Sequence, residues 1–475
     1  MRIVEGGGLG RDLHVELGGP GGRRAALTAA LREAVRSGRL APGTTLPPYR
    51  SLAADLGLAR NTVAEAYAEL VAEGWLTARQ GSGTRVADRA APPPAAEPAP
   101  APAARPAYDL RQGQPHTGSF PRGAWLAAAR RALTAAPNDA FGPGDPRGRR
   151  ELREALAGYL ARARGVRTSP ERIVVCSGFA GGLRLLAGLP QVRRGRPMAV
   201  EDYGLAHHRA ILDLAGLRTV PVAVDARGAD TAALPGTRAR SVLLTPAHQF
   251  PTGGPLHPAR RAAAVEWARH VDGLVVEDDY DGEFRFDRQP VGALQGLDPE
   301  RVVYVGSASK SLTPALRMGW MALPAHLVEP VVAAKGLREP TVSALDQLTL
   351  AEFVESGGYD RHLRGMRQRY RRRRDQLAAA LAARVPQVEV AGVAAGLHAV
   401  LRLPPGTEAA VLAAADRAGL ALDPLSAFRH PSAADPTPDG VVVGYAAPPD
   451  HAFTATLDVL CRALARGTAL TRGAR

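Results

Sequence analysis

The sequence is short of several residue types and patterns, and each shortage excludes a class of protein. It contains only two cysteines, Cys176 and Cys461, so a framework of disulfide bonds is excluded and a reducing compartment is expected. No apolar run is long enough to span a bilayer. Residues 1–8 contain no apolar segment of the kind that signal peptides carry. We therefore expect a cytoplasmic protein.

Lysine is also scarce, because Lys310 and Lys335 are the only two in a chain rich in arginine. A lysine amine can lose its proton and form a Schiff base, whereas a guanidinium stays charged. Lys310 follows a β-branched apolar run at 302–305 and small residues, and Arg317 lies seven residues further on. This stretch alone leaves two readings of Lys310 open. Either the lysine has a chemical role, or it is a chance lysine that was not replaced by arginine.

The length and charge of the chain set broad limits on its organisation. A chain of 475 residues is expected to form two or three domains, and 45% apolar residues are enough for a sizeable core. The net charge of +14 favours an anionic partner, with nucleic acid first. The same excess of arginine can also reflect the base composition of a genome. We predict no metal site from the sequence.

Residues 20–87 have the pattern of a small DNA-binding domain. The sequence predicts a helix over 24–37, a short helix over 49–56 and another from about Ala59. The last two helices, joined by a turn at Gly57, make a helix-turn-helix candidate. Residues 75–86 predict a hairpin with its tip at 81–83, which would form a basic wing. The alternative is an ordinary helical domain with a solvated basic face.

The amino-acid sequence of this segment resembles the winged-helix domain of GntR-type regulators. The resemblance lies in residues 36–43, 46–50, 56–63, 66–67, 73–74 and 81–84. Pro48-Tyr49 departs from the family, which usually has two small polar residues there. The resemblance implies DNA contacts by Arg50, Arg60, Asn61, Thr62, Tyr67, Gly81 and Ser82. Arg60 and Asn61 are suited to base edges, and Arg50 and the wing to phosphates.

Residues 88–107 form the predicted linker. From Ala90 to Pro106 the chain is almost only alanine and proline, and such a segment builds no core. We therefore place a domain boundary there, with an effector domain over 108–475.

Helical and strand-like segments alternate after the linker, which predicts an α/β fold. The strand candidates are residues 173–176, 197–200, 241–244, 274–276 and 302–305. Ligands bind beyond the carboxyl ends of the strands in such sheets. A glycine-rich turn at 177–182 follows the first candidate, residues 277–280 follow the fourth, and residues 307–310 follow the last.

These strand ends together supply what pyridoxal phosphate needs from a protein. Lys310 offers an amine for the aldehyde, Asp278 a carboxylate for the pyridine nitrogen, and Tyr280 a donor for the phenolic oxygen. The turn at Gly178, together with Ser307, Ser309 and Arg317, suits the phosphate. Taken singly, each of these strand ends is equally compatible with an ordinary loop.

Residues 141–148, 245–253, 277–285 and 307–310 resemble the MocR/GabR family, whose effector domain is a fold-type I aminotransferase. The resemblance spans almost the whole chain. It implies a large α/β domain with a small C-terminal α+β subdomain and an aldimine between pyridoxal phosphate and Lys310. It also implies a head-to-tail homodimer in which each DNA-binding domain packs against the partner's large domain.

Several positions within this resemblance stay open. We favour Asp278 over Asp279 as the family's carboxylate because Tyr280 lies two residues on, and Asp279 would then be a second-layer or solvated group. Tyr203 can stack on the cofactor ring or be a turn residue. Phe179 and Ala180 replace polar side chains in the phosphate turn, so backbone amides would do more of the binding.

The segment 441–445 carries no arginine where aminotransferases hold the substrate carboxylate. Arg209 and Arg402 are possible substitutes, each set against a surface role. We therefore expect residual transamination at most. His248 and Gln249 can contact the cofactor or pack Phe250 and Pro251. The basic helix near 361–374 can be a solvated face or a supplementary path for DNA.

Three functions compete. The first is a transcriptional regulator that depends on pyridoxal phosphate and responds to an amino compound. The second is a working aminotransferase with an accessory DNA-binding domain. The third is a vitamin B6 sensor whose cofactor is itself the effector. We rank the regulator that responds to an amino compound first, the vitamin B6 sensor second and the working aminotransferase third.

Overall fold

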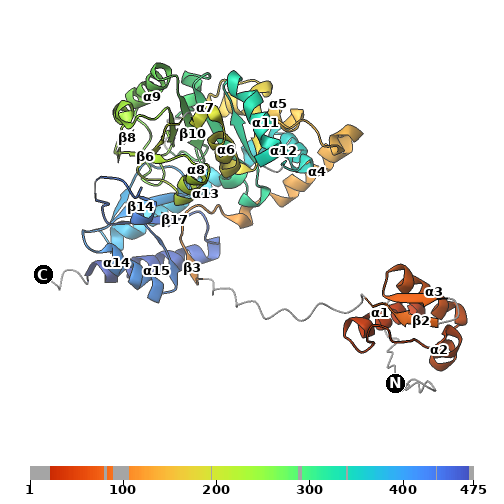
Figure 1. The fold of residues 1–475 in the computed structure, drawn as a ribbon. Helices are drawn as coiled ribbons and strands as arrows, with labels where there is room; N and C mark the ends of the chain where they lie inside the picture. The colour runs from red at the N-terminus through yellow and green to blue at the C-terminus, as the bar shows by residue number, and fades with distance from the viewer. Residues whose placement is uncertain are drawn as a thin grey trace. The chain divides into compact units, whose positions relative to one another are not determined.

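The computed structural model describes residues 22–79, 83–88, 106–193, 195–286, 291–338, 341–434 and 436–469. The chain divides into two compact units, Met1–Ala104 and Arg105–Arg475 (Figure 1). Each unit is described by itself. Most of the predicted linker and the wing residues Gly81 and Ser82 lie outside the described residues.

The N-terminal unit is a winged helix-turn-helix, as predicted. Its elements are α1 (Gly22–Arg36), α2 (Tyr49–Leu56), α3 (Arg60–Ala72), β1 (Leu76–Arg79) and β2 (Gly83–Val86). Leu27 and Leu31 of α1 pack with Val63 and Leu70 of α3, so the helical spacing in the sequence marks the buried faces. β1 and β2 pair in an antiparallel hairpin from Leu76↔Val86 to Arg79↔Gly83.

The turn between α2 and α3 depends on a glycine. Gly57 ends α2 with φ +63°, and its amide donates to carbonyls of the last turn of that helix. This left-handed conformation suits glycine because other residues are strained there.

The C-terminal unit is built on a seven-stranded sheet in the order β4-β12-β11-β10-β9-β5-β6. The strands are β4 (Ile173–Cys176), β5 (Met198–Glu201), β6 (Thr219–Val222), β9 (Ser241–Leu244), β10 (Leu274–Asp279), β11 (Val302–Ser307) and β12 (Gly319–Ala322). All five predicted strands are confirmed. β12 is antiparallel to both its neighbours, and the other pairs are parallel.

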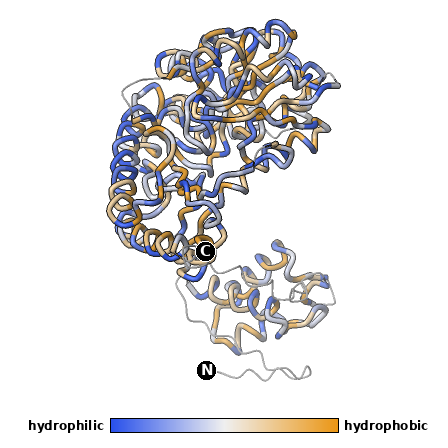
Figure 2. Tube along the Cα trace, turned by 90° about the vertical axis from the view of Figure 1, so that its left-hand side faces the viewer, coloured by the Kyte–Doolittle hydropathy of each residue, from blue (hydrophilic) through white to orange (hydrophobic). Residues whose placement is uncertain are grey.

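Helices cover both faces of this sheet. On one face lie α6 (Gly178–Ala187), α8 (Ala206–Leu214) and α11 (Ala325–Arg338), packed on Val276, Val303 and Val305. On the other lie α5 (Arg150–Arg164), α9 (Pro258–His270) and α12 (Ala344–Glu355). Because both faces are buried, the strands read as continuous apolar runs. Figure 2 shows hydrophobic stretches inside this unit and hydrophilic ones along its outer helices.

The smaller C-terminal part is an α+β subdomain, as expected. Its antiparallel sheet has the order β13-β14-β17-β16, with β13 (Glu389–Ala391), β14 (His398–Arg402), β16 (Asp423–Pro424) and β17 (Gly440–Gly444). α14 (Glu408–Arg417) and α15 (Asp450–Ala469) pack together beside it.

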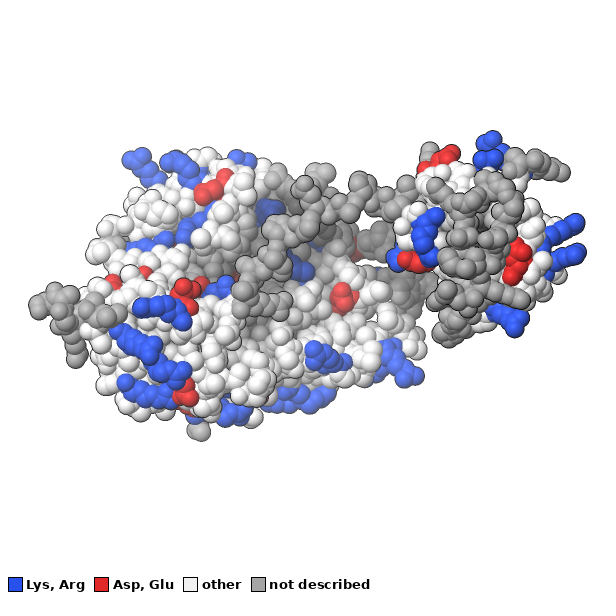
Figure 3. Space-filling view, turned by 90° about the horizontal axis from the view of Figure 1, so that it is seen from below, with Lys and Arg blue, Asp and Glu red and all other residues white. Residues whose placement is uncertain are grey.

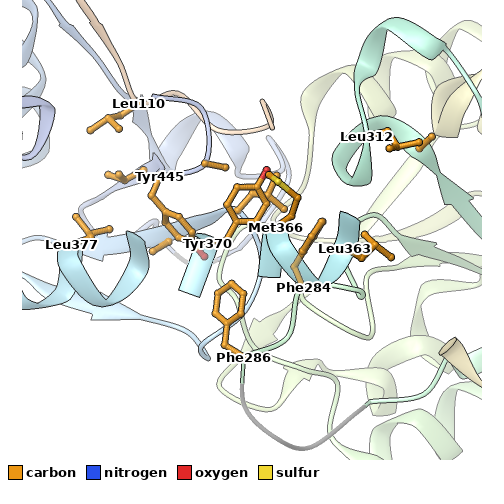
Figure 4. Close-up of a cluster of buried hydrophobic side chains, with 14 of the residues drawn as sticks. Leu110, Phe284, Phe286, Leu312, Leu363, Met366, Tyr370, Leu377 and Tyr445 are labelled. Carbon is orange, nitrogen blue, oxygen red and sulfur yellow. The ribbon is translucent and has the colours of Figure 1, made fainter. Parts of the chain in front are cut away.

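The long helix α13 (Gly358–Arg384) joins the subdomain to the large sheet. Met366 and Tyr370 of α13 lie between Phe284 and Tyr445 in the main core cluster, and Leu377 lies further along the helix, toward the subdomain (Figure 4).

Short elements complete the unit. They are β3 (Tyr108–Asp109), η1 (Thr117–Ser119), α4 (Arg122–Ala135), η2 (Asn138–Phe141), η3 (Pro170–Arg172), α7 (Pro190–Arg193), β7 (Val224–Asp225), β8 (Gly228–Ala229), η4 (Thr231–Thr237), η5 (Leu294–Leu297), α10 (Ala308–Ser311), η6 (Pro314–Leu316), β15 (Leu420–Ala421) and η7 (Leu425–Phe428). None of the helices in the described ranges combines the length and apolar composition of a membrane span.

The basic helix α13 is only partly a solvated face. Arg373 is buried and donates to the carbonyls of Tyr445, Ala446 and Pro448 and to Asp450. Arg364, Arg371 and Arg372 are exposed. Basic side chains are more widespread than acidic ones on the face of the molecule in Figure 3, as the net charge of +14 requires.

A buried ion pair ties α5 to β10 on the face of the sheet that α5 covers. Nε of Arg164 lies 2.6 Å from Oδ2 of Asp279, and Nη2 lies 3.0 Å from Oδ1. Nη1 donates to the Gly282 carbonyl, and the hydroxyl of Tyr304 donates to Asp279. The side chains of Arg164 and Asp279 are 4% and 0% exposed. Each group is therefore the main compensation for the other's burial.

We predict that Arg164→Leu lowers the free energy of unfolding by about 3–5 kcal/mol, because it leaves the Asp279 carboxylate buried without a cation. The matched control is Arg162→Leu, two residues earlier on α5. Arg162 pairs with Asp360, but its side chain is 61% exposed, so we expect a loss of about 0–1 kcal/mol. Denaturant unfolding of the full-length variants measures both, and equal losses would contradict the assigned role of burial.

Candidate functional site

One cavity in the C-terminal unit opens at the carboxyl ends of β4, β10 and β11. All ten residues predicted as cofactor contacts line it: Gly178, Phe179, Ala180, Tyr203, Asp278, Tyr280, Ser307, Ser309, Lys310 and Arg317. Parallel strands bring their carboxyl ends to one edge of a sheet, so residues far apart in sequence meet there. Arg209 also lines the cavity, whereas Arg402 does not.

Lys310 lies on α10, the single helical turn that follows β11. Its amine donates to the carbonyl of Gly113, which comes from the segment after β3. Burial lowers the pKa of Lys310, while the charges of Asp278 and Asp281 act in the opposite direction. A lowered pKa increases the fraction of neutral amine, the form that attacks a carbonyl carbon.

Asp278 and Asp279 are neighbours on β10 but lie on opposite faces of the sheet. Asp278 lines the cavity, and burial followed by the charge of Asp279 raises its pKa well above the usual range. Asp279 faces Arg164 and is 3% exposed, so the solvated alternative for Asp279 is wrong. A cationic N–H in the cavity would stabilise the charged form of Asp278.

Tyr280 lines the cavity from the end of β10 and is backed by a histidine. Its hydroxyl oxygen lies 3.0 Å from Nδ1 of His248, and the same nitrogen lies 2.8 Å from Oδ2 of Asp281. His248 is therefore behind Tyr280 and does not itself line the cavity.

Gln249 has a structural environment. Its amide nitrogen donates to the carbonyl of Phe250 at 2.7 Å, and its amide oxygen accepts from the hydroxyl of Thr252 at 2.5 Å. These bonds stabilise the turn before residue 253. They agree with the structural role that the sequence allowed for Gln249 as the alternative to cofactor contact.

The N-terminus of α6 forms the end of the cavity suited to an anion. Gly178 starts this helix with φ +76°, and the first amides of a helix carry a partial positive charge. Gly319 lies so close that a Cβ there would be 2.8 Å from the Cα of Gly178. Ser307, Ser309 and the exposed Arg317 line the same cavity. This donor set fits the phosphate of pyridoxal phosphate.

Tyr203 is buried at the cavity wall, 4% exposed. The guanidinium carbon of Arg429 lies 4.7 Å from its ring centroid, and Phe250 and Phe428 pack in the same apolar cluster. Phe179 lies beside His208, with ring centroids 4.6 Å apart. Burial lowers the pKa of His208 well below its usual range.

The cations proposed for a substrate carboxylate are differently placed. Arg209 donates to the carbonyls of Gly204, Phe428 and Arg429 at 3.0–3.3 Å. Arg402 has a largely exposed side chain 3.9 Å from Glu389, away from the cavity. The substitute role of Arg402 is therefore not supported by its position. Val442 of β17 is fully buried in the apolar cluster around Tyr203 and Phe250.

Several lining residues were missed from the sequence: Gln112, Gly113, Gln114, Glu201, His207, His208, Thr245 and His398. The two adjacent histidines at 207–208 and the carboxylates after the predicted strand at 197–200 could have indicated some of these lining residues from the sequence. Gly113 and His398 gave none, because only the fold brings them to Lys310.

The predicted DNA contacts lie mainly at the start of α3. Arg60 and Asn61 are exposed, Thr62 is half-buried, and Arg50 is exposed on α2. Tyr67 differs, because it is 5% exposed and its hydroxyl donates to the carbonyl of Pro47 at 2.9 Å. This placement favours packing over direct DNA contact for Tyr67.

Comparisons with family models agree with this division of the chain. Residues 24–86 match the model of bacterial regulatory proteins of the gntR family, and residues 106–435 match aminotransferases of class I and II.

Three relatives share this arrangement over most of their length. The chain is 32% identical to the pyridoxine biosynthesis transcriptional regulator PdxR of Corynebacterium glutamicum, over 88% of this chain and 91% of that one. It is 32% identical to the probable rhizopine catabolism regulatory protein MocR of Rhizobium meliloti, over 88% of each. It is 33% identical to the regulator TauR of Rhodobacter capsulatus, over 87% and 91%.

Solved aminotransferases share the fold of the C-terminal unit. An archaeal alanine:glyoxylate aminotransferase superposes with a TM-score of 0.68 at 23% identity, covering 76% of this chain and 91% of that one. The α-aminoadipate aminotransferase LysN of Thermus thermophilus gives a TM-score of 0.68 at 25% identity, covering 76% and 93%.

Glu201, at the end of β5, gives the cavity a pH-dependent group. Burial raises its pKa to about 7, although the hydroxyl and amide of Thr245 and the amide of Gln249 donate to it. Folding therefore favours its protonated form. That contribution to stability is complete below the unfolded pKa near 4.5 and is lost as the pH rises through about 7.

We predict that the stability of the Glu201→Gln variant relative to the unsubstituted chain increases by about 3 kcal/mol as the pH is raised from about 4 to about 8. The reason is that the glutamate loses its proton over this range, whereas glutamine has none to lose. Both Thr245 donors point to one oxygen, which the amide oxygen can replace. Glu154→Gln on α5, where the side chain is 46% exposed, should leave the pH dependence unchanged. Denaturant unfolding across this range measures both, and a constant difference would refute the raised pKa.

Proposed function

Because the chain belongs to the family of HTH-type regulators that join a GntR DNA-binding domain to a domain of aminotransferase class I and II, we propose that it is a transcriptional regulator whose effector domain binds pyridoxal phosphate. The observation that carries this proposal is the single cavity lined by Lys310, Asp278, Tyr280 and the start of α6. We propose residues 20–87 as the DNA-binding domain, 88–107 as the linker and 108–475 as the effector domain.

Each side chain of the cavity has a defined task in this proposal. Lys310 would hold the aldehyde carbon of the cofactor, Asp278 the pyridine nitrogen and Tyr280 the phenolic oxygen. The amides of α6, with Ser307, Ser309 and Arg317, would hold the phosphate. When bound, pyridoxal phosphate supplies an electrophilic carbon that amines attack. The buried wall around Tyr203 would keep water from the ring.

The charges in the cavity bear on the class of effector. The segment 441–445 at the end of β17 carries no arginine, Val442 within it is buried in an apolar cluster, and Arg209 already donates to three carbonyls. This favours an effector bound without a strong carboxylate clamp, which includes the cofactor itself. The name of one relative, a regulator of pyridoxine biosynthesis, supports the same class of effector. Efficient transamination of α-amino acids is correspondingly disfavoured.

We also propose a head-to-tail homodimer in the cytoplasm. Large apolar side chains are exposed on α4 and around it: Leu126 at 70%, Phe141 at 55%, Leu345 at 45% and Leu133 at 40%. Exposed apolar groups gathered in one region are typical of association surfaces. Both cysteines are buried and neither is in a disulfide bond within the described residues, as suits a reducing compartment.

The chain's two lysines provide a matched test of cofactor attachment. We expect Lys310→Arg to lose the visible absorption band that the purified chain acquires with pyridoxal phosphate, because guanidinium forms no Schiff base. Lys335 lies outside the cavity and donates to the carbonyl of Pro146, so Lys335→Arg should retain the band. Absorption spectra recorded after removal of free cofactor measure the band in both variants. A band retained by Lys310→Arg would refute the attachment of the cofactor to Lys310.

DNA recognition is tested with duplexes selected from a random-sequence library by the cofactor-loaded chain. Arg60→Ala should weaken binding to a selected duplex by about 10-fold or more, since one base-reading arginine contributes about 1–3 kcal/mol. Arg32→Ala is the control, because Arg32 on α1 is paired with Glu73 at 2.7 Å.

The same duplex tests coupling between the two domains. We expect its affinity or footprint to differ between the chain with and without pyridoxal phosphate, because an effector must bind the two conformational states unequally. If the affinity and footprint are identical with and without pyridoxal phosphate, the cofactor does not control DNA binding and the proposed coupling is refuted.

A further inference from the structure

His248 and Asp281 form a buried pair directly behind Tyr280. Nδ1 of His248 lies 2.8 Å from Oδ2 of Asp281 and 3.0 Å from the hydroxyl oxygen of Tyr280. The side chains of His248 and Asp281 are 3% and 1% exposed. One nitrogen therefore faces two oxygens, and its single hydrogen or lone pair has to serve both.

The carboxylate decides what Nδ1 carries. An ionised Asp281 can only accept, so Nδ1 carries a hydrogen and donates it to Oδ2. The hydroxyl of Tyr280 then finds an N–H at this position and no lone pair. Its oxygen can accept a share of that hydrogen, but its own proton has to be directed elsewhere. Tyr280 lines the cavity, whereas His248 does not.

Close packing fixes the imidazole in this orientation. A Cβ at Gly396 would lie 2.4 Å from Oδ2 of Asp281 and 2.5 Å from Cε1 of His248, so the loop closes against both groups. The ring of His398 lies 5.4 Å from that of His248, and its Nε2 faces the carbonyl of Pro251. The His248 ring therefore has little freedom to turn its other nitrogen toward Tyr280.

We propose that His248 and Asp281 are positioning residues that hold the hydroxyl of Tyr280 as a hydrogen-bond donor into the cavity, toward the phenolic oxygen of bound pyridoxal phosphate. The inference rests on the proposed function. Burial, with the charges of Asp281 and Asp278, raises the pKa of Tyr280 well above its usual range, so the phenol keeps the proton it would donate. Neither positioning residue touches the cofactor, and each acts through Tyr280.

The readout is the pH midpoint of the visible absorption band of the cofactor-loaded chain. A donor to the phenolic oxygen withdraws electron density from it, which weakens its hold on the proton shared with the nitrogen of Lys310. Loss of the donor therefore raises the midpoint. We expect Tyr280→Phe to raise it by about one pH unit or more, and His248→Phe to raise it by a smaller amount.

A double-mutant cycle separates positioning from other roles. In the Tyr280→Phe chain, adding His248→Phe should produce no further shift, because the hydroxyl through which His248 acts is gone. A shift that persists in the double variant would overturn the inference, and so would a single His248→Phe variant with an unchanged midpoint. If His248→Phe does not fold, His248→Leu takes its place in the same cycle with the same expected outcome.

His430→Phe is the matched control. This buried histidine lies 3.0 Å from the hydroxyl of Thr219 and does not line the cavity, so the midpoint should stay unchanged. An equal shift in this control would also overturn the inference, because the effect would not be specific to Tyr280. Absence of a visible band in the unsubstituted chain would instead refute the proposed function.

Discussion

The site depends on the two-residue alternation of strand β10. Successive side chains of a strand point to opposite faces, so Asp278 enters the cavity while Glu277 and Asp279 face the helices on the other side. Two carboxylates adjacent in sequence thereby acquire different partners. Asp279 is compensated by Arg164, and its charge in turn raises the pKa of Asp278. A shift of one residue in register would exchange the two roles.

The other groups of the site reach this edge because the strands are parallel. β4, β10 and β11 end together, and a different chemical group lies at each end: the start of α6 after β4, Asp278 and Tyr280 at the end of β10, and Lys310 after β11. The antiparallel strand β12 returns between β11 and β4 and brings Gly319 against Gly178. Glycine at both positions lets the backbone of the anion-binding turn lie flush with the sheet.

Sequence patterns predicted the parts of this arrangement that are local. Continuous apolar runs predicted β4, β9, β10 and β11, because strands buried on both faces tolerate few polar residues. They missed β6 and β12, which belong to the same sheet. The residues after the strand ends, together with the resemblance to the MocR/GabR family, predicted ten lining residues of the cavity. The contacts of Gly113 and His398 could not be predicted, since they depend on segments that meet only in the folded chain. The position of Arg402, whose exposed side chain favours the surface role over the substitute role, depends likewise on the folded small sheet.

The two parts of the C-terminal unit both contribute to the cavity, and this bears on how a ligand could act as a signal. Lys310 and Asp278 come from the large sheet, whereas Leu397 and His398 come from the start of β14 in the small subdomain. A ligand that contacts both parts binds most tightly at one relative arrangement of the two. Differential affinity of this kind is what a ligand needs in order to shift a conformational equilibrium. The same interactions that would hold pyridoxal phosphate therefore suit a switch, and they require no turnover.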